Sequence, residues 1–172
     1  MQRDREYVEY VSARLPALHR AAYLLCGDGH RADDIVAATT MVLYRHWRRA
    51  KDADNIDAYV HRILVRKFLE ERRLHWARVR LMPQLPVVEL VSWPDSSPER
   101  GVEQRDLLRD ALAQLSRPQR TVLVLRFVCD MSVDEVAAVL RCSSGNVKSH
   151  TSRGLAAMRR VLGTEQTASA DS

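Results

Sequence analysis

Residues 132–160 read SVDEVAAVLRCSSGNVKSHTSRGLAAMRR, and they carry the strongest fold signal in the chain. Ser132 and Glu135 stand at the spacing of a capping box, in which each side chain satisfies a backbone amide of the other residue. The apolar run Val136–Leu140 follows at once. Together these residues predict a helix of about two turns that begins after Ser132.

A turn and a second helix are expected next. Arg141-Cys142-Ser143 make the turn, and Ser143 or Ser144 can cap the helix that follows. Val147 falls where an apolar side chain packs back onto the first helix, close to the small Ala137. The turn needs a residue in the left-handed conformation, and glycine often occupies this position in two helices joined by so short a turn. Arg141 at this position costs on the order of 1 kcal/mol in backbone strain. The pattern predicts a helix-turn-helix.

The second helix of this unit has the composition of a DNA-facing element. Residues 136–164 contain no carboxylate, although the chain has 22 acidic residues in all. A helix in the major groove needs cations beside the phosphates and hydrogen-bonding side chains in its N-terminal turns. A surface helix with a solvated basic face is the alternative, and the long acid-free stretch favours DNA. The candidate DNA-binding residues are Ser144, Asn146, Lys148, Ser149, His150, Ser152 and Arg153.

Apolar periodicity predicts three helices in the first half of the chain. The first spans about residues 7–26, with Val8 and Leu15 among the apolar residues of its buried face. The second spans about residues 32–49. The third begins after Asp54-Asn55, both good N-caps, and continues to about Arg80.

Proline then separates two helical blocks. Four of the six prolines fall between residues 81 and 102, and proline disfavours helix because it lacks the amide donor. In the second block, Ser116 caps a helix that has Pro118 in its first turn. The fold class is therefore expected to be all-α, with two small helical domains joined by a Pro-containing linker. The expected divisions are residues 1–80, the linker 81–102, residues 103–163, and a disordered tail at 164–172.

Composition narrows the functional classes. The formal charge of +5 and the pI of about 9.4 favour an anionic partner such as nucleic acid. Cys26, Cys129 and Cys142 form no CxxC pair, so neither a metal site nor a disulfide framework is expected, and no cofactor is implied. No stretch approaches the ~20 apolar residues of a membrane span, so a cytoplasmic protein without membrane insertion is expected. Asp33 and Asp34 are adjacent, no third acid converges on them, and no Gly-rich phosphate loop is present, which argues against an enzyme.

Both blocks resemble one protein family. The stretch DALAQLSRPQRTVLVLRFVCDMSVDEVAAVLRCSSGNVKSHTSRGLAAMRR resembles region 4 of a bacterial sigma factor. Two earlier stretches, AAYLLCGDGHRADDIVAATTMVLYRHWRRA and NIDAYVHRILVRKFLEERR, are similar to sigma region 2. Region 2, a short linker and region 4, in that order, resemble the extracytoplasmic-function (ECF) group over about residues 5–163.

The resemblance implies a role for each part. A sigma factor binds core RNA polymerase, places it on promoter DNA and helps to open the duplex. The helix around residues 33–47 would dock on polymerase, with Asp33, Asp34, Val36 and Thr40 as the candidate residues. The loop at 51–55 and the following helix would take the −10 element, with Asn55, Arg62, Arg66 and Arg73 as candidates. The second helix of the helix-turn-helix would read the −35 element, where Lys148, Ser149 and Arg153 match DNA-facing positions.

Alternatives remain open at several of these positions. The three arginines of the −10 set could instead form a solvated helix face with Glu70 and Glu71 as partners, and Asn55 equally fits a plain N-cap. Residues 36–40 lack the Gln and acidic pair that relatives commonly have, which bears on polymerase binding. An anti-sigma protein is a possible partner, as in many members of the family. The alternative function is a stand-alone helix-turn-helix regulator that does not bind core polymerase.

Overall fold

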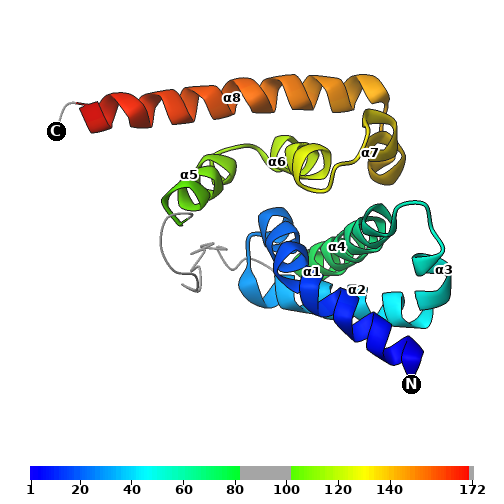
Figure 1. Ribbon diagram of the computed structural model, residues 1–172. Coiled ribbons are helices and arrows are strands. Elements are labelled where there is room, and N and C mark those ends of the chain that lie inside the picture. The colour runs from blue at the N-terminus through cyan, green and yellow to red at the C-terminus, as the bar shows by residue number, and fades with distance from the viewer. Residues whose placement is uncertain (82–101, 171–172) are drawn as a thin grey trace. The chain divides into compact units, whose positions relative to one another are not determined.

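The computed structural model describes residues 1–81 and 102–170, with side chains described for residues 1–73 and 107–163. The chain divides into two compact units, Met1–Pro94 and Asp95–Ser172. Every regular element in the described residues is a helix (Figure 1). The expected all-α fold with two small helical domains is confirmed.

The first unit packs three long helices around a shared core. α1 (Gln2–Cys26), α2 (Gly29–Arg45) and α4 (Ile56–Leu81) contact one another pairwise, and the short α3 (Trp47–Lys51) packs against α2 and α4. Fully buried aliphatic side chains fill the space between them: Ile35, Leu43, Leu64 and Val65. The helices therefore bury their apolar faces against each other and leave polar faces outside.

The turn between α1 and α2 follows from local sequence. Gly27 ends α1 with φ 73°, ψ 10°, a left-handed conformation in which glycine has no Cβ to clash. Asp28 then caps α2, its side chain accepting a hydrogen bond from the backbone N–H of Arg31 at 2.8 Å. The break between the first two predicted helices is therefore present, and it lies at Gly27 and Asp28.

Two details of the first unit differ from the sequence expectation. The helix expected to run to Arg49 is interrupted at His46, whose φ of −106° and ψ of 18° lie outside the helical range. Trp47 directly follows this break and lies in the core, with only 4% of its surface exposed. On the apolar face expected of α1, Val11, Leu18, Ala22 and Leu25 are buried as predicted, but Val8 and Leu15 at its edge are 56% and 40% exposed.

The second unit contains the helix-turn-helix. Its elements are α5 (Val102–Ala113), α6 (Arg117–Leu123), a π-helical turn η1 (Val124–Val128), α7 (Val133–Leu140) and α8 (Ser144–Ala170). α8 packs against α5, α6 and α7. α6 and α8 approach closely at Gly154, where an added Cβ would lie 3.0 Å from Leu123 Cδ1, so the absence of a side chain lets the two helices meet.

The end of the chain also departs from expectation. α8 continues to Ala170, so residues 164–170 are helical rather than the disordered tail expected from Thr164 onward. Helix propagation adds one hydrogen bond per residue once a nucleus exists, and neither glycine nor proline follows Gly163 to stop it. The small and polar residues after Gly163 are therefore not enough to end the helix.

Candidate nucleic-acid interface

The first helix of the helix-turn-helix begins with a complete capping box. The Ser132 hydroxyl accepts a hydrogen bond from Glu135 N–H at 3.1 Å, and the Glu135 carboxylate accepts one from Ser132 N–H at 2.8 Å. α7 ends at Arg141, with φ 54° and ψ 49°. The sequence prediction of a capping box followed by a left-handed turn residue is confirmed at both positions.

The turn fixes the start of α8 through two serines with different roles. Ser143 is the cap: its hydroxyl accepts a hydrogen bond from Asn146 N–H at 3.1 Å. Ser144 instead donates to the Asp134 carboxylate of α7 at 3.0 Å, which joins the two helices directly. Val147 is fully buried beneath them. A buried apolar side chain and a direct hydrogen bond therefore both help to fix α8 against α7.

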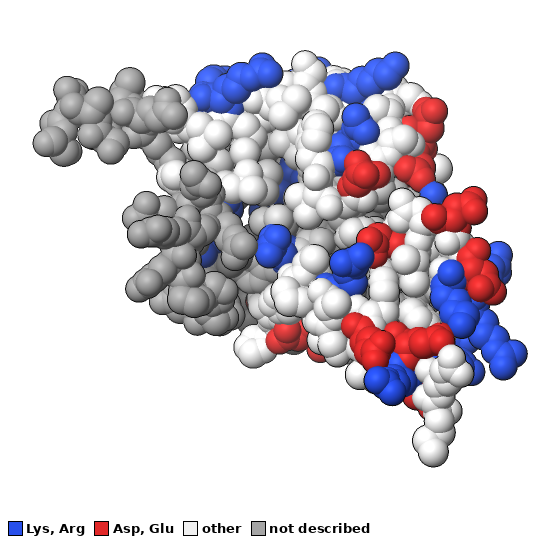
Figure 2. All heavy atoms as spheres, viewed as in Figure 1, with Lys and Arg blue, Asp and Glu red and all other residues white. Residues whose placement is uncertain are grey.

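The exposed side of α8 has small residues along its middle and cations along its borders. At 3.6 residues per turn, Gly145, Ser149, Ser152 and Ala156 fall along the centre of this side. The borders carry Lys148 and Arg159 on one side and Asn146, Arg153 and Arg160 on the other, all exposed. Figure 2 shows basic side chains over α8 at the top of the view. Such a surface can bring the helix close to a groove floor while its edges meet phosphates.

One predicted residue of this helix lies elsewhere. His150 borders the buried side of α8, and its Nδ1 is buried without a hydrogen-bond partner among the described residues. The side chain is therefore directed toward the body of the unit rather than along the exposed side. Of the seven residues predicted here, the exposed ones are Asn146, Lys148, Ser152 and Arg153, whereas Ser144 and Ser149 are half-buried.

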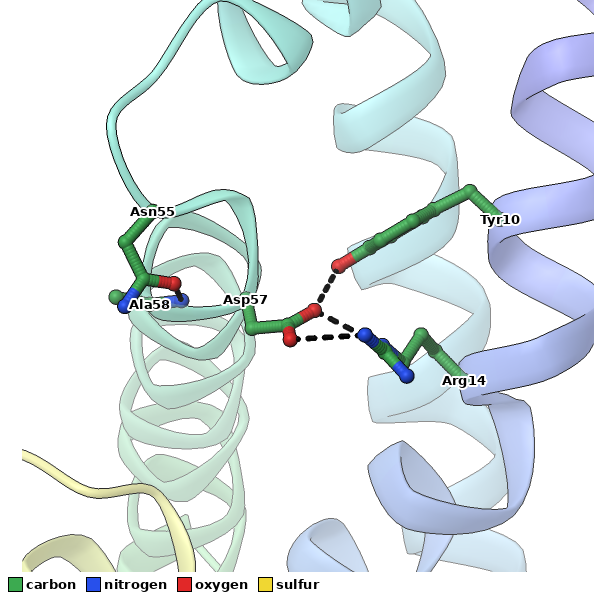
Figure 3. Close-up of polar contacts among 5 residues, drawn as sticks. All are labelled: Tyr10, Arg14, Asn55, Asp57 and Ala58. Atoms are coloured by element: carbon green, nitrogen blue, oxygen red, sulfur yellow. Dashed lines mark hydrogen bonds and ion pairs between the residues drawn. The ribbon is translucent and has the colours of Figure 1, made fainter.

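A second polar surface lies along α4 of the first unit. Asn55 is exposed, and its side-chain oxygen accepts a hydrogen bond from Ala58 N–H at 3.0 Å, so it caps α4 (Figure 3). Arg62, Arg66 and Arg73 are all exposed, and their spacing places them along one side of the helix. The structure thus supports the N-cap role of Asn55 and gathers the three arginines on one face.

The beginning of α4 is held by residues that the sequence analysis did not single out. The Asp57 carboxylate accepts hydrogen bonds from the Tyr10 hydroxyl at 2.6 Å and from two nitrogens of Arg14 at 2.9 and 3.0 Å. Figure 3 shows both donors reaching across from α1. Since these residues are 43–47 positions apart in the chain, no local pattern could have paired them.

These contacts shift the acidity of the groups involved. Desolvation pulls the pKa of Asp57 upward, but the hydrogen bonds from Tyr10 and Arg14 and the positive charge of Arg14 outweigh it, so the net pKa is lowered. Burial, followed by the hydrogen bond to Asp57 and its negative charge, raises the pKa of the Tyr10 hydroxyl. The network therefore holds Asp57 ionised and Tyr10 protonated at neutral pH.

The predicted polymerase-binding residues of α2 divide between surface and core. Asp33 and Asp34 are exposed, and the Asp33 carboxylate lies 2.7 Å from His19 Nε2 of α1. Val36 is only 6% exposed, so its side chain is part of the core and is not available to a partner. Thr40 is half-buried, and its carbonyl accepts a hydrogen bond from the Tyr7 hydroxyl at 2.7 Å.

Other residues of α2 occupy the exposed positions. Ala37, Met41 and Tyr44 lie at helical spacing after Asp34, and Met41 and Tyr44 are 60% and 44% exposed. The sequence analysis missed them, although counting three and four residues on from Asp34 would have found them. Tyr44 is also held by α1, because its hydroxyl donates to Asp4 at 2.9 Å.

The described residues show no grouping of His, Cys, Asp or Glu that could hold a metal ion. Cys26 and Cys129 are buried, and burial raises the pKa of the Cys129 thiol to about 12. Over the same described parts of the chain, no helix combines the length and apolar character that a bilayer crossing requires.

Two separate helical units, one with a basic helix-turn-helix and the other with an arginine-bearing helix, are typical of a DNA-binding transcription protein. Residues 10–78 match the family description "Sigma-70 region 2", and residues 105–158 match "Sigma-70, region 4". The chain is 37% identical over 160 residues to an RNA polymerase sigma-E factor of Streptomyces avermitilis, covering 91% of this chain and 85% of that protein. The chain belongs to the sigma-70 family of RNA polymerase sigma factors, in the ECF group.

Other relatives agree with this assignment. An RNA polymerase sigma-E factor of Streptomyces coelicolor is 36% identical, with 91% of this chain and 86% of that protein covered. The ECF RNA polymerase sigma factor EcfG of Rhodopseudomonas palustris is 27% identical, with coverage of 88% and 82%. Because the likeness extends over both units, the protein acts as a sigma factor that directs RNA polymerase to promoter DNA. A stand-alone regulator is not favoured.

Solved structures show the same fold. The sigma factor RpoE of Bartonella quintana, crystallised with the anti-sigma factor NepR, matches with a TM-score of 0.71 and 23% identity, over 92% of this chain and 98% of that one. CnrH, solved with the cytosolic domain of CnrY, matches with a TM-score of 0.53 over 94% and 90% of the two chains, also at 23% identity.

Proposed function

We propose that α8 reads the −35 promoter element, that the loop of residues 52–55 and the exposed side of α4 take the −10 element, and that the exposed side of α2 docks on core polymerase. The observation that carries this division is the surface of α8, which has small residues at its centre, cations at its borders and no carboxylate before residue 165. The two binding domains would be residues 1–80 and 103–163, with residues 81–102 between them.

The geometry of α8 supports direct readout of the major groove. Lys148 and Arg153 lie within its first three turns, on opposite borders of the exposed side. An arginine there can form two hydrogen bonds to a guanine edge, and a lysine can bind a base or a phosphate. Ser149 and Ser152 between them are short enough to let the helix approach the bases.

The surface of α4 suits a separated strand better than a duplex groove. Arg62, Arg66 and Arg73 follow the helix axis over about 16 Å, a spacing along which a single-strand backbone could run. Asn55 stands at the start of this path and offers an amide nitrogen in addition to the oxygen that caps the helix. We assign the −10 element to this side of the first unit.

Polymerase docking is assigned to Asp33, Asp34, Ala37 and Met41, which are exposed on α2. Val36 contributes only by packing, because its side chain is buried. An anti-sigma protein covering this surface is a further proposed partner, supported by the fold shared with an RpoE that was crystallised with NepR.

The protein is proposed to work by binding alone, without an enzymatic step of its own, and in the cytoplasm where the chromosome and polymerase are. The described residues hold no cluster suited to metal catalysis, and the family consists of transcription initiation factors.

Run-off transcription from a promoter library tests the assignment. Purified core polymerase with the chain should yield start sites that share paired −35 and −10 motifs, absent when the chain is omitted. When a cation of α8 is replaced by alanine in this assay, Arg5→Ala is the control for the loss of a positive charge alone, since Arg5 lies on α1 and pairs with Glu9 at 3.0 Å. Co-elution with core polymerase is measured in parallel. An absence of transcripts together with an absence of co-elution would overturn the proposal.

A further inference from the structure

The loop between α3 and α4 is fastened to α1 at both ends. Before the loop, Lys51 at the end of α3 lies 3.0 Å from the Glu6 carboxylate. After it, Asp57 in the first turn of α4 binds Tyr10 at 2.6 Å and Arg14 at 2.9 Å. The loop residues 52–55 and Ile56 lie between these two attachments.

The three α1 residues form one unit because they are spaced by four. Glu6, Tyr10 and Arg14 therefore lie on the same side of the helix. Since an α-helix rises about 1.5 Å per residue, their attachment points are set about 12 Å apart from first to last. The ring of Tyr10 is itself fixed against Trp47, with centroids 5.5 Å apart. We refer to Glu6, Tyr10 and Arg14 as the α1 clamp.

The α1 clamp adds little to the stability of the fold. The side chains of its ion pairs are 37–47% exposed, and ion pairs at this exposure contribute little because water screens them. α1 is held to the unit by buried apolar residues such as Val11, Leu18 and Leu25. The main consequence of the α1 clamp is therefore geometric: it fixes where the loop begins and ends.

We propose that Glu6, Tyr10 and Arg14 are positioning residues that hold the loop 52–55 and the start of α4 ready for the −10 element, so that α1 controls promoter opening from outside the DNA-facing surface. The proposal rests on the assignment of this loop to the −10 element. A short loop that must capture DNA loses less conformational entropy on binding if its ends are already fixed. Asn55 would be the residue whose position the α1 clamp determines.

Asp57→Asn separates this idea from simple electrostatics. Removing a negative charge beside a DNA-binding loop should by itself strengthen DNA binding, because repulsion of phosphates falls. The α1 clamp predicts the opposite, a defect in promoter opening, since Arg14 and Tyr10 lose their charged acceptor. Tyr10→Phe is the second variant, because it removes only the hydroxyl and keeps the ring against Trp47.

Glu71→Gln provides the matched control. Arg31 and Glu71 also form a two-bonded arginine–carboxylate pair between helices of the first unit, at 2.7 and 2.8 Å. This pair joins α2 to a part of α4 four turns beyond Asp57 and is less exposed, at 26% for each side chain. The control should therefore lower the thermal stability at least as much as the two test variants while leaving the loop in place.

Amide hydrogen exchange on the full chain gives the first readout. Both test variants should accelerate exchange of Ala53, Ala58 and Tyr59, whose amides are bonded to Ala50 and Asn55 at 3.0–3.2 Å. Glu71→Gln should not. A uniform acceleration throughout residues 1–73 in the test variants would show a general loss of stability and would overturn the proposal.

Transcription on two templates gives the second readout. With core polymerase, the test variants should reduce run-off from a duplex promoter by roughly threefold to tenfold, the effect expected of one hydrogen bond. Run-off from a template opened beforehand by mismatches should be unchanged, and Glu71→Gln should show no difference between the templates. An equal loss on both templates would overturn the positioning role.

Asn55→Ala distinguishes the failure of this proposal from failure of the function beneath it. If Asn55→Ala impairs opening and Tyr10→Phe does not, the loop reads DNA without help from α1, and the positioning role is wrong. If neither variant impairs opening although wild-type protein supports transcription, the assignment of the loop to the −10 element is wrong. The positioning role of the α1 clamp is then wrong as well.

Discussion

Arg141 holds a backbone conformation that its side chain makes costly. With φ 54° and ψ 49°, it occupies the left-handed region where a Cβ crowds the following carbonyl oxygen. Arg141→Gly should stabilise the second unit by about 0.5–1 kcal/mol, the strain removed less the entropy that glycine adds to the unfolded chain. Urea or thermal unfolding of the full chain measures it. Arg141→Ala is the control, because alanine keeps the Cβ and should bring no gain.

Arg153 and Lys148 are proposed to meet DNA in different ways, and their alanine variants should differ accordingly. Arg153→Ala should cost about 1–3 kcal/mol in promoter binding and relax the preference at one base of the −35 element. Lys148→Ala, if that side chain meets a phosphate, should weaken all promoters equally and reduce the salt dependence of binding by about one ion. Binding of the holoenzyme to promoter variants at several salt concentrations measures both. Equal loss of core-polymerase binding in Arg153→Ala would contradict this division of roles.

Among the elements, those that depend on local chemistry were predictable from the sequence. The capping box at Ser132 and Glu135, the cap at Ser116 and the chain reversal at Gly27 each depend on residues within four positions of one another. The all-α fold and the place of the helix-turn-helix followed from these signals and from apolar periodicity. The family resemblance added the functional order of the two units.

Features that depend on tertiary packing could not be read in the same way. Val8 and Leu15 have the spacing of the buried face of α1, yet packing against α2 and α4 covers only the other residues of that face and leaves these two exposed. The break at His46 is a feature that helix propensity does not encode. Tyr10, Arg14 and Asp57 met only because α1 and α4 lie side by side. Of the residues predicted to bind polymerase, Asp33 and Asp34 are exposed, whereas Val36 is buried and was wrongly expected at the surface.

The small contribution of the contact between α1 and α4 to stability should be lost in acid. Because the folded-state pKa of Asp57 lies below its ordinary value of 3.8, its contribution is complete above that value and is lost as the pH falls through the lower, folded-state pKa. Asp57→Asn should therefore be less stable than wild type near pH 6, and the difference should shrink below about pH 4. Urea unfolding across this pH range tests the sign. A difference that stays constant to pH 3 would show that the carboxylate charge contributes nothing.

At the scale of the whole molecule, residues 82–101 connect the described helices of the two units, both of which are proposed to bind DNA. Twenty residues can span at most about 70 Å, whereas half a turn of DNA, about five base pairs, displaces a site by about 17 Å and turns it to the opposite side of the duplex. The length of the connection alone would therefore allow both units to stay on their elements if five base pairs were inserted between them. A strict requirement for spacing between the two promoter elements must come from polymerase holding both units at once.

The distance between the −35 and −10 elements is thus the test of how the whole chain works. Inserting five base pairs between them should abolish most run-off transcription, since a unit that loses its element forfeits several base contacts at about 1–3 kcal/mol each. The same insertion upstream of the −35 element, which leaves their spacing intact, should have no effect. Binding of the chain to either template without polymerase should be weak and indifferent to the spacing, because only the connecting residues then relate the two units. Transcription that tolerated the inserted half turn would mean that one unit alone selects the promoter, and the two-surface mechanism would have to be abandoned.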